Sequence, residues 1–342
     1  MLPEMLYIEN DLLPMLRETW PEITLKNVNK QLSQWAGEPG VFCDLRGVDT
    51  TKSLHIPDYN HQDIHWDCEK MFASQLKSVL GPRSDRVPSI RADMGCGLIG
   101  ALFGLRQTLF IDKRPWLLDH LTREQIMSLE PGEFTINQEY EQALEHMRYM
   151  KRMLSGTGIE LYPLDLQGPV DSAHLLYGDA FFYELYDDPF FVKHLFDIVH
   201  AALVKLMQDS FDIIKPETFV AHYNSLVLPM ATPLKISEDT STLLSKEHIH
   251  QYCIPYTNAL LEHFGGGYIH YCGWNPHLYD AVTSHMPRVV GLNFGNPEKH
   301  DMPFVLRDLA ERKKYYYGMI NDDMVEYSKK DGVWYLFRYL YS

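Results

Sequence analysis

Two residues of one short segment, His270 and Cys272, carry the clearest chemistry in this sequence. They lie two positions apart in residues 265–273, GGGYIHYCG, a run that is typical of a β-strand. Because strand side chains alternate between two faces, these two point to the same side, about 7 Å apart at the backbone. An imidazole and a thiolate arranged in this way can fill two positions of a tetrahedral zinc site. Both residue types also occur in ordinary protein cores, so the spacing alone leaves a structural role open.

Eight short apolar runs, which we predict to be strands, alternate with helical stretches along the chain. They are residues 41–46, 88–94, 160–166, 218–223, 268–272, 288–294, 314–320 and 333–339. Parallel neighbours need a crossover connection, usually a helix, so the alternation predicts a parallel sheet. The sequence therefore predicts an α/β fold, a single-domain (β/α)8 TIM barrel over residues 1–342. We expect an N-terminal helical extension, a long helical insertion between strands 2 and 3, and little room for a closing helix after strand 8.

Polar residues follow many of these predicted strands. In a (β/α)8 barrel the carboxyl ends of the strands meet around the active site. Asp93 is therefore a candidate catalytic residue, although it could instead cap the segment that follows it. The residues predicted to line a substrate pocket are Gln167, His222, Asn224, Asn293 and Asn321, with Asp165 beside them.

The composition limits the classes of partner. The chain has 31 Lys and Arg against 46 Asp and Glu, a net charge of −15, which argues against nucleic acid and anionic membrane surfaces. No apolar stretch is long enough to span a membrane, and the N-terminus does not resemble a signal peptide. Five irregularly spaced cysteines do not form a disulfide framework. We expect a cytoplasmic protein with reduced thiols that acts on a small molecule; a homodimer is compatible with the sequence.

A glycine-rich segment offers a competing interpretation. Residues 92–100, ADMGCGLIG, contain G-x-G-x-x-G after a predicted strand and resemble the cofactor loop of S-adenosylmethionine-dependent methyltransferases. However, the helix predicted after it is only about two turns long, which is too short for a parallel crossover. A single glycine motif is weak evidence, so the barrel is preferred.

A series of short motifs resembles the uroporphyrinogen decarboxylase superfamily. In chain order they are Gln167-Gly168-Pro169, Gly178, Asp187-Asp188-Pro189, Ile236-Ser237-Glu238-Asp239, Leu244-Ser245, Pro255-Tyr256, Gly265-Gly266 and His270-Tyr271-Cys272-Gly273. The resemblance covers residues 87–322 and implies a (β/α)8 fold, in agreement with the strand count.

The closer branch of this superfamily is the corrinoid-dependent, methylcobamide:coenzyme M-like methyltransferases. In that branch zinc is bound by H-x-C on the fifth strand and by a cysteine near the end of the eighth. His270 and Cys272 match the first two ligands, but residues 333–339 contain no cysteine. Glu238 or Asp239 could complete the set, and His222 and Cys96 are further candidates. The resemblance thus implies a Zn2+-dependent methyltransferase of one-carbon or demethylation metabolism, with a corrinoid protein or methylated cobamide as methyl donor or acceptor.

Two alternatives stay open. One is a metal-independent uroporphyrinogen decarboxylase-like enzyme of porphyrin biosynthesis, in which Asp93 would stand where the family has its pyrrole-binding aspartate. This chain lacks the family's arginine-rich N-terminal segment and is strongly acidic, which disfavours a substrate with many carboxylates. The other is a non-catalytic barrel that binds a small ligand or a corrinoid partner. A second group, His61, His65 and Cys68, has helical spacing on a predicted outer helix, and we expect it to be structural.

Overall fold

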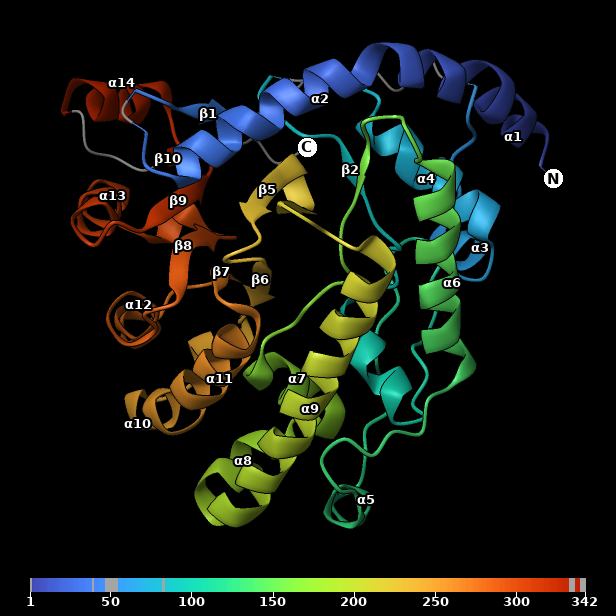
Figure 1. Cartoon of the computed structure of the whole chain (residues 1–342). Coiled ribbons are helices and arrows are strands. Elements are labelled where there is room, and N and C mark those ends of the chain that lie inside the picture. The colour runs from blue at the N-terminus through green and yellow to red at the C-terminus, as the bar shows by residue number, and fades with distance from the viewer. Residues whose placement is uncertain (1, 39, 47–54, 82–83, 332–335, 339–342) are drawn as a thin grey trace.

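The computed structural model describes residues 2–38, 40–46, 55–81, 84–331 and 336–338 (Figure 1). Its helices are α1 (Pro3–Tyr7), α2 (Leu13–Trp35), α3 (His61–His65), α4 (Cys68–Val79), α5 (Arg123–Ser128), α6 (Gln138–Met153), α7 (Pro169–Tyr177), α8 (Ala180–Asp187), α9 (Pro189–Ile214), α10 (Lys246–His248), α11 (Ile254–Phe264), α12 (Pro276–Asp280), α13 (Met302–Glu311) and α14 (Asp322–Asp331). Its strands are β1 (Cys43–Asp44), β2 (Ser89–Ile90), β3 (Glu160–Leu161), β4 (Phe219–His222), β5 (Leu226–Pro229), β6 (Leu234–Ser237), β7 (Gly267–Tyr271), β8 (Val289–Phe294), β9 (Tyr315–Gly318) and β10 (Leu336–Arg338). Among these residues, no helix is both long and apolar enough to cross a membrane.

A parallel sheet of six strands organises the fold. Its order is β1-β10-β9-β8-β7-β6, and every neighbouring pair runs parallel. Strands β2 and β3 form a separate parallel pair, and one bridge between Gln167 and Ser237 connects the segment after β3 to the end of β6. The α/β class and the parallel pairing are therefore confirmed. Within the described residues no ladder joins β1 to β2, so the closed barrel stays a prediction.

The fourth predicted strand is wrong in its pairing. Residues 218–223 do contain β4, but β4 pairs antiparallel with β5 in a hairpin apart from the main sheet. The strand that pairs with β7 is β6, which is not among the eight predicted strands. Leu234 and Ile236 on β6 are fully buried, whereas Lys235 and Ser237 alternate with them and face the other side. The period-two pattern is present, but it covers only four residues.

The glycine-rich segment does not form a dinucleotide-type motif. Residues Cys96–Leu102 form a 3-10 helix, and Thr108 contributes only an isolated antiparallel bridge to Trp116. A Cβ atom on Gly97 or Gly100 would come within 2.9 Å of the Leu117 side chain. These glycines therefore allow close packing of the loop on itself, and the competing cofactor-loop interpretation is wrong.

Helix α2 crosses one end of the sheet and hairpin, next to β1, β5 and β10 (Figure 1). The Trp35 indole donates to the carbonyl of Val227 at 2.6 Å, and the Gln34 amide donates to the carbonyl of Leu336 at 2.8 Å. The Tyr315 hydroxyl donates to the carbonyl of Trp35 at 2.8 Å. These bonds satisfy backbone carbonyls that would otherwise be buried without partners, and they fix the helix across the strand ends.

Candidate metal site and substrate cavity

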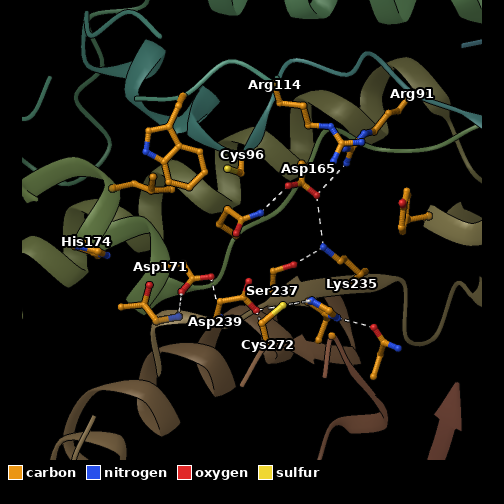
Figure 2. Close-up of a pocket in the computed structure, with 18 of the residues that line it drawn as sticks. Arg91, Cys96, Arg114, Asp165, Asp171, His174, Lys235, Ser237, Asp239 and Cys272 are labelled. Carbon is orange, nitrogen blue, oxygen red and sulfur yellow. Dashed lines mark hydrogen bonds and ion pairs between the residues drawn. The ribbon is translucent and has the colours of Figure 1, made fainter. Parts of the chain in front are cut away.

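A cavity of about 530 Å3 opens where the parallel strands end (Figure 2). Its lining side chains come from the carboxyl-terminal parts of β6, β7, β8 and β9 and from the segments after β2 and β3. Among them are Arg91, Arg114, Trp116, Asp165, Gln167, Leu175, Lys235, Asp239, His270, Cys272, Asn293 and Gly295. Strands of one parallel sheet end at the same edge, so polar residues far apart in the sequence meet there.

Asp239, His270 and Cys272 bring three different ligand atoms together. In the described part of the chain, these are the three residues of metal-binding type (His, Cys, Asp or Glu) whose ligand atoms all lie within 4.8 Å of one another. The His270 Nε2 atom is 3.5 Å from Cys272 Sγ and 3.7 Å from an Asp239 carboxylate oxygen. For tetrahedral zinc with ordinary bond lengths, these separations should be about 3.5 Å and about 3.4 Å. The three residues therefore fit zinc, and a fourth position remains for a water or substrate atom.

The protonation states suit such a site. Burial and the nearby Lys235 lower the pKa of His270, so its imidazole is neutral as a ligand must be. Burial and the charge of Asp239 raise the pKa of the Cys272 thiol to about 11. Without a cation, then, the sulfur keeps its proton at neutral pH. A bound metal ion would be needed to hold it as the thiolate.

Asp239 is held in place by a second carboxylate. The Asp171 carboxylate accepts hydrogen bonds from the backbone nitrogens of Asp239 and Thr240, at 3.0 and 2.5 Å. Asp239 in turn accepts a hydrogen bond from the Cys272 backbone nitrogen at 2.6 Å. Burial and the negative charge of Asp239 raise the pKa of Asp171. The loop after β6 and the end of β7 are thus tied together around the three ligand atoms.

Glu238 points away from this group, into the protein. It is fully buried and accepts hydrogen bonds from Ser241 at 2.8 Å and Thr257 at 3.0 Å. Burial and the neighbouring Asp171 raise its pKa strongly. A Cβ on Gly168 would lie 2.2 Å from the Glu238 carboxyl, so the Gln-Gly-Pro motif leaves room for this side chain. Of the two carboxylates predicted as a third ligand, Asp239 is the one beside His270 and Cys272.

The opposite wall of the cavity carries positive charge (Figure 2). Arg91 is buried and bonds to Asp93 at 2.9 Å and Asp165 at 3.0 Å, and Arg114 bonds to Asp93 at 3.1 Å. Lys235 lies 3.5 Å from Asp165. Three cations therefore face two carboxylates, and the Arg114 side chain is 54% exposed. Although burial opposes it, the charges of Lys235 and Arg91 lower the pKa of Asp165, so this network stays ionised.

The remaining predicted residues divide between the cavity and other places. Gln167 and Asn293 line it, but Asp93 lies behind its wall between two arginines. His222 is buried with its Nε2 atom 2.7 Å from the carbonyl of Pro233, and burial lowers its pKa to about 3. Asn321 is exposed and accepts a hydrogen bond from the backbone nitrogen of Met324, so it caps α14.

The structure places His222 and Asn321 on other parts of the fold. His222 belongs to the antiparallel hairpin, which is separate from the parallel sheet, and Asn321 lies exposed three residues beyond β9. Neither lines the cavity. Asn224 lies in the turn Tyr223–Ser225, and its side chain is outside the described part of the structure.

Lys235 and Arg114 also line the cavity, although the sequence patterns do not predict them there. Lys235 lies on the unrecognised strand β6, where the alternation of Leu234 and Ile236 with polar residues could have revealed it. Arg114 comes from an irregular segment that no periodic pattern identifies. His61, His65 and Cys68 do not form a group of ligand atoms in the described residues; instead His65 is buried 2.8 Å from Glu139.

Comparisons with known proteins bear on the fold. No family model matches this chain, and the search of curated proteins finds no match. Among solved structures, a methyltransferase from Methanosarcina mazei is similar, with a TM-score of 0.57 over 91% of each chain. The chain has a methyltransferase-like fold. Only 11% of the aligned residues are identical, so the likeness concerns the fold alone.

Proposed function

We propose that this protein is a zinc-dependent methyltransferase of the (β/α)8 barrel type. It would transfer a methyl group between a small molecule and a cobamide, free or carried by a corrinoid protein. Counting β6 as the fourth strand gives eight parallel strands, β1, β2, β3 and β6 to β10, which is the number a closed barrel needs. The methyltransferase with a similar fold adds independent support.

The observation that carries the proposal is the meeting of Asp239, His270 and Cys272 at the end of the cavity. They offer an oxygen, a nitrogen and a sulfur ligand at spacings suited to a tetrahedral ion. Catalytic zinc sites commonly use three protein ligands and leave one position open. Zinc bound there would act as a Lewis acid on a substrate atom in that position.

Protein side chains of the cavity have separate tasks in this proposal. Asp171 fixes the backbone that carries Asp239, which holds the oxygen ligand in register with the other two. Arg114 and Lys235 would attract an acidic group of the small molecule on the facing wall. Trp116 and Leu175 supply apolar surface against which the rest of that molecule can pack.

The metal-independent decarboxylase receives less support. Asp93, the residue that would bind pyrrole nitrogens, has both carboxylate oxygens in contact with arginines. It therefore serves as the counter-ion of Arg91 and Arg114, and it does not line the cavity.

Metal analysis of purified protein tests the proposal. We expect nearly one zinc per wild-type chain, and a large loss in His270→Ala, Cys272→Ala and Asp239→Ala. His174→Ala and Cys96→Ala are matched controls, because they remove the same residue types from the same cavity and should keep the metal. Methyl exchange with methylcob(III)alamin and a panel of acidic thiols and amines should follow zinc content. Wild-type protein without metal under reducing, zinc-replete conditions would refute the proposal.

A further inference from the structure

We infer that Asn293 is a positioning residue that fixes the His270 ring so that Nε2 faces the metal site. This inference deepens the proposed function and rests on it for the role of the metal. Asn293 lies on β8 directly opposite His270 on β7 in the parallel ladder, and its side chain is buried. The two paired side chains therefore project from the same face of the sheet.

The orientation of the Asn293 amide follows from its partners. One end contacts the backbone carbonyl of Tyr317 at 2.7 Å, and the other contacts His270 Nδ1. A carbonyl oxygen can only accept, so the end facing Tyr317 must be the NH2 group. The end facing His270 is then the amide oxygen, which can only accept as well. The amide orientation is set by a backbone atom of the next strand, β9, and not by the histidine.

The acceptor on Asn293 decides which nitrogen of His270 carries the proton. Nδ1 must be protonated to donate to the amide oxygen. A neutral imidazole has one ring proton, so Nε2 keeps a free lone pair. That atom is the one 3.5 Å from Cys272 Sγ and 3.7 Å from Asp239. The two hydrogen bonds, from Asn293 to Tyr317 on β9 and from His270 to Asn293, thus select the His270 tautomer that can bind a metal.

This role differs from the substrate-binding role predicted from the sequence. The oxygen and nitrogen of the Asn293 side chain are both engaged with protein atoms, although the residue borders the cavity. Hydrogen bonds from a second layer of residues orient metal-binding histidines and raise their basicity, and their loss typically costs about 10–100-fold in metal affinity. Asn293 would act on the metal through His270 without touching it.

Two variants of nearly the same shape separate the positioning role from simple packing. Asn293→Leu removes the acceptor, whereas Asn293→Asp keeps an oxygen that can accept from Nδ1. Nitrogen-15 NMR of the metal-free protein reports the tautomer directly, with signals assigned through His270→Ala and with His174 as an internal control. We expect the Nδ1–H tautomer in the wild type and in Asn293→Asp, and its loss in Asn293→Leu. Thermal unfolding checks that both variants are folded.

Zinc affinity, measured by competition with a chromophoric chelator, is the second readout. We expect it to fall about 10–100-fold in Asn293→Leu and less in Asn293→Asp. An Nε2–H tautomer in the wild type, or an unchanged tautomer and zinc affinity in folded Asn293→Leu, would overturn the inference. Wild-type protein that shows the Nδ1–H tautomer but binds no zinc would support the positioning of the ring and refute the zinc enzyme. Failure of the Asn293 positioning role can therefore be distinguished from failure of the proposed zinc-dependent function.

Discussion

A single methyl group at Gly295 should displace the Cys272 sulfur from the proposed metal site. An ideal Cβ at this position would lie 2.3 Å from Cys272 Sγ, whereas ordinary contacts of this kind are about 3.5–4.0 Å. The sulfur would have to move by more than about 1 Å, yet zinc–sulfur bonds vary by only a few tenths of an ångström. Gly295→Ala should therefore bind zinc as poorly as Cys272→Ala. Forcing the methyl group into this space should also lower the free energy of unfolding by about 1–3 kcal/mol.

A double-mutant cycle tests whether the sulfur is the cause. In Cys272→Ala the sulfur is gone, and the next atom, the Cβ of residue 272, is 3.4 Å from the added methyl group. Gly295→Ala should then cost less than about 0.5 kcal/mol, which gives a coupling of about 0.5–3 kcal/mol. Urea unfolding of the four metal-free proteins under reducing conditions measures it. Gly318→Ala is the matched control: its Cβ would lie 2.4 Å from the Tyr316 hydroxyl, so it should destabilise the fold but retain zinc. Equal costs of Gly295→Ala in both backgrounds, or normal zinc binding by Gly295→Ala, would refute this reasoning.

Three further predictions concern buried ionisable groups. Burial lowers the pKa of Lys314 to about 8, so the unfolded chain holds more protons between pH 8 and about 10.5. The free energy of unfolding of the wild type, relative to that of Lys314→Met, should therefore rise across that window by up to about 3 kcal/mol. Urea titrations at pH 7.5 and 10 measure this change, and an unchanged difference between the two proteins would contradict the prediction. Burial holds His222 neutral with a pKa of about 3, so the free energy of unfolding of the wild type should decrease as the pH falls through 6.5. Between pH 7 and 4.5 this decrease should be about 2–3 kcal/mol larger in the wild type than in His222→Gln. Because Glu238 is buried with a raised pKa, Glu238→Gln should be close to neutral in thermal unfolding at pH 7. Glu238→Ala should instead cost about 2–4 kcal/mol, because it leaves a cavity and removes the carboxyl that accepts from Ser241 and Thr257; equal losses would argue that the carboxyl is ionised.

The sequence predicted the parallel sheet because its long strands show clear patterns. The segments of β7, β8 and β9 are apolar, β-branched or aromatic and lie between helices, so their existence follows from local pattern and burial. Strand β6 was missed because four residues with a lysine among them do not stand out from a loop. The β4–β5 hairpin could not be predicted, because Ser225 in its turn has a φ of 62°, which non-glycine residues seldom adopt.

In the candidate site, too, local sequence pattern predicts some residues and only the packed structure reveals others. His270 and Cys272 were predicted because two residues on one strand share a face, a rule that needs no tertiary information. Asp239 was predicted as a ligand only from the family resemblance. That Asp239, and not Glu238, lies beside His270 depends on the loop after β6, whose backbone donates hydrogen bonds to Asp171. Arg114 reaches the cavity from an irregular segment, so only the packed structure could reveal it. Whether these residues act in methyl transfer stays a prediction.

The hydrogen bonds of α2 have a consequence for how the chain reaches its native state. Trp35 bonds to a residue 192 positions later, Gln34 to one 302 positions later, and Tyr315 reaches back 280 positions. Contacts of such high sequence separation close very large loops and form late, which slows folding. During synthesis α2 is made before almost all the strands on which it packs. Trp35 is therefore exposed until those strands have left the ribosome. We therefore expect α2 to pack productively only after Leu336 has been synthesised, and the growing chain to depend on protection of that apolar face.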